Sequence, residues 1–170
     1  MNVRDEKFQM MEFEFQSADL KQGDPLPAMM KCIRDFHGIE NYHAPVSMIL
    51  TELVSNALDH GILKLQSSLK KDESGFEAYY IEKQKRLNLL DQGFIKVNIY
   101  KDSSDAGESY CISVEDSGEG FETTRKLTQL EDNLAYFGRG IQLLQKLCSE
   151  ISYNNAGNRV TVRYCCYPQT

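Results

Sequence analysis

An apolar stripe with helical spacing runs through positions 46–57. Its members are Val46, Leu50, Leu53, Val54 and Ala57, which recur at i, i+3 and i+4. Side chains with this spacing share one side of an α-helix, and so dense a stripe has to be covered by a second layer. We therefore expect a helix at the centre of the domain, ending at Gly61 with His60 in its last turn.

A polar face accompanies this stripe. Glu52, Asn56 and Asp59 fall on a separate arc about 60° wide. Glu at i and Asn at i+4 can offer a proton acceptor beside an oxygen ligand for a hard cation. Taken alone, however, the pattern fits a solvated helix face better than a ligand site, and Asp59 in particular is expected to be solvated.

The size and charge of the chain limit its class. Its 170 residues suit one domain, 1–170, that buries roughly 70% of its unfolded surface. The net charge of −6 argues against general binding to nucleic acid or to an acidic membrane surface. No apolar run approaches the ~18 residues of a membrane span. Five cysteines without a C-x-x-C pair, with Cys32, Cys111 and Cys148 among apolar neighbours, suggest buried, reduced thiols in a cytoplasmic protein.

Alternating apolar residues predict strands before and after the central helix in the sequence. The expected strands lie at 10–15, 94–100, 110–115, 151–153 and 159–165, the second with the third and the fourth with the fifth forming hairpins. Further helices are expected at 24–36 and after Gly140, one or two more in an insertion at 65–93, and a polar, mobile segment at 122–137. Each hairpin predicts an antiparallel pair of strands.

Two glycine motifs follow the predicted strands. Asp116-x-Gly118-x-Gly120 places a carboxylate beside backbone that can approach a ligand closely, although an ordinary Asp-Ser-Gly turn has the same pattern. A buried Asp there could accept a hydrogen bond from an exocyclic amine, as in the selection of adenine over guanine.

The second motif is Gly138-Arg139-Gly140, directly before an apolar helix. Free N–H groups and the positive end of a helix dipole would make this segment an anion site. A glycine-flanked helix start without a ligand is an equally good interpretation of this motif in isolation.

The order of these features along the chain resembles that of the GHKL ATPase superfamily, which includes gyrase B, Hsp90, histidine kinases and MutL. The features are the helix with Glu52, Asn56 and His60-Gly61, the two glycine motifs, and a final hairpin that holds Thr161. The short span between the glycine motifs looks most like the anti-sigma-factor serine kinases of the RsbW and SpoIIAB type. The segment from Asn56 to Leu63 and the insertion after it look closer still to the C-terminal kinase domains of proteobacterial response regulators that carry a PP2C-type phosphatase.

This resemblance implies a Bergerat fold, an α+β two-layer sandwich with helices on one face of a mixed, mostly antiparallel sheet. Glu52 would be the general base, Asn56 would ligate Mg²⁺, and residues 122–137 would form the ATP lid. Asp116 would bind the adenine amine with support from Thr161, while His60 would pack at the helix end. The remaining nucleotide-binding residues implied are Gly118, Gly120, Gly138, Arg139 and Gly140.

The implied activity is Mg²⁺-ATP-dependent phosphorylation of a serine or threonine on a STAS-type anti-sigma-factor antagonist. Anti-sigma or sigma factors are further partners of this type, and a homodimer is left open. The expected lid is short and not glycine-rich, so the resemblance does not assign its contacts to phosphate. The 65–93 insertion is absent from the minimal kinases, so their dimer and partner surfaces do not transfer.

The alternative is a module that binds a partner when nucleotide is bound and turns over little ATP. Such a module does not require a general base, so it does not explain the carboxylate of Glu52. A histidine kinase fits less well, because none of His37, His43 and His60 heads an acidic, proline-containing dimerisation helix. Gyrase-like or Hsp90-like chemistry needs long additional domains.

Overall fold

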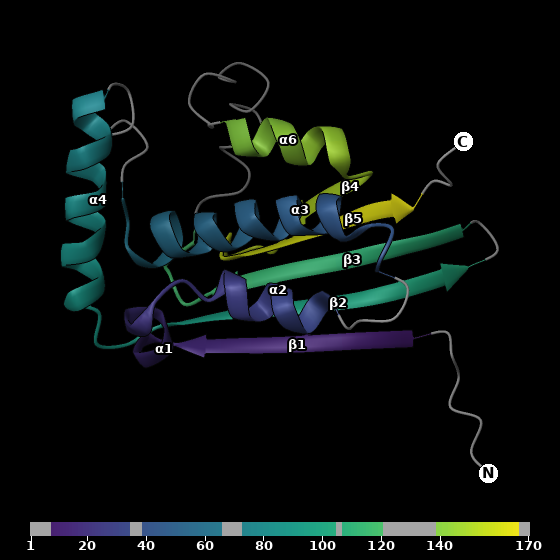
Figure 1. The fold of residues 1–170 in the computed structure, drawn as a ribbon, viewed down its shortest axis with the longest axis horizontal. Coiled ribbons are helices and arrows are strands. Elements are labelled where there is room, and N and C mark those ends of the chain that lie inside the picture. The colour runs from purple at the N-terminus through teal and green to yellow at the C-terminus, as the bar shows by residue number, and fades with distance from the viewer. Residues whose placement is uncertain (1–7, 35–38, 66–72, 105–106, 121–138, 167–170) are drawn as a thin grey trace, which may run out of the picture.

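The structure is a computed structural model that describes residues 8–34, 39–65, 73–104, 107–120 and 139–166 (Figure 1). The expected lid, 122–137, and the first part of the insertion lie outside the described residues. Five strands form one sheet in the order β1-β2-β3-β5-β4. Their bounds are β1 Phe8–Gln16, β2 Phe94–Ser104, β3 Gly107–Asp116, β4 Glu150–Tyr153 and β5 Arg159–Cys166.

Every pairing in this sheet is antiparallel. The two predicted hairpins are confirmed as β2–β3 and β4–β5. The expectation of a mixed sheet is wrong for the described strands, because even the long connection from β1 to β2 returns the chain antiparallel to its neighbour.

One face of the sheet carries the core. Phe13, Val97, Val114 and Val160 face one another across β1, β2, β3 and β5, and Val97 and Val114 are fully enclosed. Since side chains alternate along a strand, Asp116 belongs to this same face. The opposite face is polar and carries ion pairs, such as that between Arg159 and Glu115.

The helices lie on the apolar face of the sheet, as expected for a two-layer sandwich (Figure 1). Their bounds are α1 Ser17–Gln22, α2 Leu26–Arg34, α3 His43–Asn56, α4 Glu73–Asn88 and α6 Arg139–Leu147. At the start of α2, Asp24 Oδ1 accepts a hydrogen bond from the Leu26 N–H at 2.9 Å and so satisfies one of the free donors of the first turn. Helix α3 packs between α2 and α6, and all five members of its apolar stripe are buried.

Helix α3 does not end at Gly61. It continues as a π-helical turn, η1 (Ala57–Ile62), in which the Leu63 N–H donates to the Leu58 carbonyl at 2.8 Å. A π-turn widens the helix and changes the direction of the side chains that follow it. Consequently Asp59 is buried, at 5% exposure, and the expectation that it is solvated is wrong. His60 is exposed rather than packed, with Nδ1 2.7 Å from the Leu65 carbonyl.

The described part of the insertion is the single helix α4, which stands across one end of the α3 layer (Figure 1). All five cysteines are free thiols; Cys111 and Cys166 are buried, whereas Cys32 is exposed, contrary to expectation. None of the described helices combines the length and apolarity that a membrane crossing requires.

Candidate functional site

Glu52 and Asn56 lie one helical turn apart in the middle of α3, and both are half-buried. Neither side chain forms a hydrogen bond or ion pair with another described residue. Since no described residue pairs with this half-buried carboxylate and amide, both keep hydrogen-bonding capacity that water or a ligand can satisfy. The structure therefore keeps these two predicted residues together on one face, and removes Asp59 from it.

Asp116 lies at the end of β3 beside the far end of the same helix. Its side chain is only 8% exposed. The Gly118 N–H donates to Asp116 Oδ1 at 2.8 Å. The backbone of Asp116 is held by Asn158, whose carbonyl accepts from the Asp116 N–H and whose side-chain amide donates to the Asp116 carbonyl, each at 2.9 Å. Asn158 is a supporting residue that the sequence analysis did not identify.

Glycines allow the helix end and the Asp116 loop to approach each other. A Cβ on Gly61 would stand 2.5 Å from Asp116 Cγ, and one on Gly118 would collide with the Gly61 carbonyl. Gly120 has a φ of +70°, and a side chain there would collide with the Ala156 carbonyl. The function of Gly61 is thus to let Asp116 lie against the helix, not to terminate the helix.

The Asp116 side chain is shielded from solvent, and no Lys, Arg or His of the described segments forms an ion pair with it. Burial raises the pKa of the Asp116 carboxyl to about 6, opposed by the Gly118 N–H donor and reinforced by the nearby charge of Glu115. A buried carboxyl of this kind would be better satisfied by a ligand that brings a hydrogen-bond donor. The exocyclic amine of adenine has that chemistry.

The N-terminus of α6 lies against Glu52. A Cβ on Gly140 would overlap Glu52 Oε2, so the carboxylate occupies the space that a side chain at 140 would take. Arg139 is the first residue of α6, although its side chain is not described, and Gly138 lies outside the described residues. The first turn of a helix has N–H groups without helical partners, which suit an anion.

Thr161 is not brought to this site. It faces Ser113 in the β3–β5 register, whereas the core-facing positions of β5 are Val160 and Val162. Because alternate residues of a strand point to opposite faces, Thr161 lies on the other side of the sheet from Asp116. The predicted support of Asp116 by Thr161 is therefore replaced by support from Asn158.

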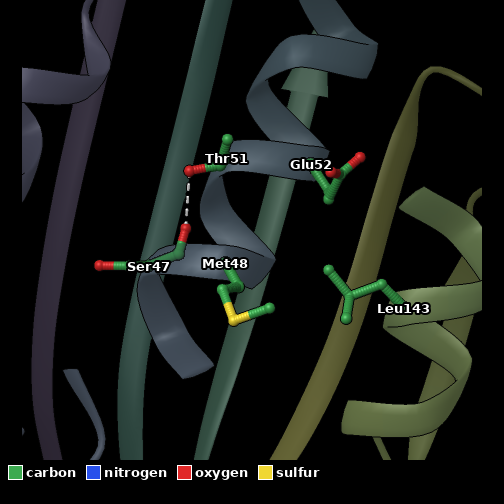
Figure 2. A pocket seen from close by; sticks show the side chains of 5 residues that line it. All are labelled: Ser47, Met48, Thr51, Glu52 and Leu143. Carbon is green, nitrogen blue, oxygen red and sulfur yellow. Dashed lines mark hydrogen bonds between the residues drawn. The ribbon is translucent and has the colours of Figure 1, made fainter. Parts of the chain in front are cut away.

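A groove of about 220 Å³ opens between α3 and α6, beside Glu52 (Figure 2). It is lined by Ser47, Met48, Thr51, Glu52 and Leu143. Met48 of α3 and Leu143 of α6 supply its apolar walls, and the Thr51 hydroxyl donates to the Ser47 carbonyl at 2.8 Å. The volume is below the roughly 300–1,000 Å³ of pockets that hold drug-sized ligands, so the groove suits a side chain rather than a nucleotide.

The fold and the site together define an α+β domain in which the buried carboxylate of Asp116 lies at one end of the central helix and the start of α6 lies against Glu52. The family model described as a histidine kinase-like ATPase domain matches residues 28–164, and the chain belongs to this family. A comparison with curated proteins gave no match. The match covers Glu52, Asn56, Asp116 and the start of α6, so the site lies within the family's domain.

The described residues alone do not supply a full set of metal ligands at this site. In the described parts of the chain, no three His, Cys, Asp or Glu side chains gather closely enough to hold a metal. The half-buried amide of Asn56 can supply one oxygen ligand, and phosphate oxygens and water would supply the others. Mg²⁺ commonly keeps several waters and phosphate ligands, so this donor set fits a Mg²⁺–nucleotide complex.

Proposed function

We propose that the protein is a Mg²⁺-ATP-dependent protein serine/threonine kinase of the anti-sigma-factor type. The observation that carries the proposal is the position of Glu52 between Asn56, the start of α6 and the apolar groove, where no other described residue pairs with its carboxylate. A domain that only binds nucleotide needs an adenine site and a phosphate site. It has no need of a carboxylate placed where a second substrate can enter.

The proposed nucleotide position follows the axis of α3 and η1. Adenine would lie at Gly61 and Asp116, where the buried carboxyl awaits a donor. The phosphates would lie near Asn56 and the start of α6, whose free N–H groups favour negative charge. Bound Mg²⁺ would supply charge neutralisation on the phosphates.

Glu52 would accept the proton of the attacking hydroxyl. It is half-buried and one helical turn from Asn56, so the base and the metal ligand share one face. General-base residues contribute roughly 10²–10⁴-fold to rate, and most of the remaining acceleration comes from positioning and charge.

The groove would receive the segment of the protein substrate next to its acceptor hydroxyl. Glu52 lies at its edge and Met48 and Leu143 form its apolar walls, so the groove favours an apolar side chain near the phosphorylated residue. A STAS-type anti-sigma-factor antagonist is the substrate class we propose, and its source is the sequence resemblance. Binding of an anti-sigma or sigma factor, and homodimerisation, belong to the same proposal.

The decisive experiment is transfer from γ-labelled ATP to a panel of STAS-type antagonists. Glu52→Gln should abolish most of the transfer while Mg²⁺-ATP binding, measured by calorimetry, stays within about twofold, because the amide keeps the shape but not the basicity. Glu77→Gln, on the exposed face of α4, is the matched control.

Undiminished transfer by Glu52→Gln would contradict the assignment of the base. Binding of both nucleotide and antagonist by the wild-type protein without any transfer would instead support a nucleotide-gated binding module.

A further inference from the structure

A buried charged cluster joins α4 to the π-turn at the end of α3. The Tyr79 hydroxyl donates a short hydrogen bond to Asp59 Oδ2, and Lys83 Nζ lies 2.7 Å from Asp59 Oδ1. Tyr79 is 1% exposed and Asp59 5% exposed. Burial, with the adjacent Asp59 carboxylate, raises the pKa of Tyr79, so its hydroxyl remains a donor.

A second connection runs from the same helix to the loop after Asp116. Arg86 Nη1 donates to the Leu63 and Lys64 carbonyls at 2.7 and 2.8 Å, directly after the π-turn. Lys64 Nζ in turn lies 2.8 Å from Glu119 Oε1, within the Asp116–Gly120 motif. This last ion pair is exposed and contributes little on its own. Helix α4 therefore holds the π-turn on both sides of Gly61.

The π-turn matters because Gly61 forms one wall of the Asp116 site. Gly61 lies so close to Asp116 that a Cβ added to it would stand only 2.5 Å from Asp116 Cγ. A small shift of the turn therefore changes the space around the carboxyl. An ionised Asp59 can stay buried only with its partners, because a buried charge without them is strongly unfavourable. Loss of a partner would therefore move Asp59 toward water and carry Gly61 with it.

We propose that Asp59 is a positioning residue for adenine binding and that α4, through Tyr79 and Lys83, sets the shape of the adenine pocket. The proposal rests on the proposed function in that adenine is taken as the ligand at Asp116. A protein or ligand that displaces α4 would then lower the affinity for ATP without touching the nucleotide. The insertion thus acts as a control element of the site.

The test compares Tyr79→Phe with Tyr80→Phe, whose hydroxyl is lost from a side chain that is 65% exposed. Affinities for ATP and ITP are measured by calorimetry, because ITP lacks the exocyclic amine that Asp116 would bind. Tyr79→Phe should weaken ATP binding about fivefold or more and bring the ATP/ITP affinity ratio closer to one. Tyr80→Phe should leave both values unchanged.

A merely structural role would lower the unfolding free energy without changing the ATP/ITP ratio, and that result would overturn the proposal. Lys83→Met provides a second variant, with Lys85→Met as its exposed control. Both of these remove one charge from α4, so a difference between them reports on the buried cluster.

Hydrogen exchange on the nucleotide-free protein separates this proposal from the proposed function. Faster exchange in residues 57–63 and 116–120 of Tyr79→Phe, but not of Tyr80→Phe, would support coupling between α4 and the site. If the wild-type protein binds neither ATP nor ITP, the proposed function fails. Equal exchange in the two variants would contradict the coupling whether or not nucleotide binds.

Discussion

Asp116 combines two properties that have opposite effects on stability and on binding. Its burial favours the protonated form in the empty protein, whereas acceptance of a hydrogen bond from an amine favours the ionised form. A protein that kept this carboxyl only for its fold would gain stability by replacing it with a neutral side chain. Because the buried carboxylate of Asp116 lowers the stability of the fold, its presence indicates a role in binding a ligand.

We expect Asp116→Asn to stabilise the empty protein but weaken ATP binding. The pKa of Asp116 rises from 3.8 to about 6 on folding, so the unfolded chain loses its proton first as the pH increases. As the pH increases from about 4 to about 6, the ionisation of Asp116 should lower the free energy of unfolding of the wild-type protein, with no further decrease from this group above pH 6. Urea unfolding at several pH values should show that loss reduced in the variant.

The same variant should bind ATP more weakly by about 1–3 kcal/mol, the range for an unmatched buried polar group. Calorimetry at neutral pH measures this directly. Unchanged ATP affinity in Asp116→Asn would remove Asp116 from the adenine site.

At the level of the elements, the proposed function assigns the groove between α3 and α6 to the protein substrate and not to the nucleotide. Met48→Glu places a charge on its apolar wall, one turn from Glu52. We expect phosphorylation of a protein substrate to fall through a raised KM, with Mg²⁺-ATP affinity unchanged. Met10→Glu, at an exposed position of β1, is the control, and equal kinetics in both variants would argue against the groove.

The strands and the central helix were predictable because their apolar periods are local. The alternation Val160-Thr161-Val162 also contained the information that Thr161 points away from the core, although the resemblance led to the opposite expectation. The π-turn has no comparable local signal. It depends on the contact of Gly61 with Asp116, and the burial of Asp59 depends on Tyr79, twenty positions away in the sequence.

The site was predictable to a similar degree. Glu52 and Asn56 lie one helical turn apart, as their spacing predicted. Asp116, Gly118 and Gly140 lie against the same helix, a convergence that the family resemblance implied and the spacing did not. Asn158 carried no signal as a single residue in a polar turn, since its role requires knowing which strand it faces.

For the whole molecule, a ligand that binds only the folded state must raise its stability. We expect Mg²⁺-ATP at 100 times its Kd to add about 2.7 kcal/mol to the unfolding free energy, which corresponds to roughly 5–10 °C in Tm for a chain of this size. Thermal unfolding with and without nucleotide measures the shift. Asp116→Asn should show a smaller shift at the same concentration, and a wild-type Tm independent of ATP would contradict nucleotide binding.

The position of β1 has a consequence for synthesis of the chain. Gln16 pairs with Phe94 and Phe8 with Asp102, so β1, the first strand of this sheet to be synthesised, has no ladder partner until β2 emerges. Meanwhile α2 and α3 are complete but lack the sheet that covers their apolar sides. During that interval the apolar sides of α2 and α3 are exposed, which is the kind of surface that chaperones recognise. The sheet can be completed only after β5 has emerged from the ribosome.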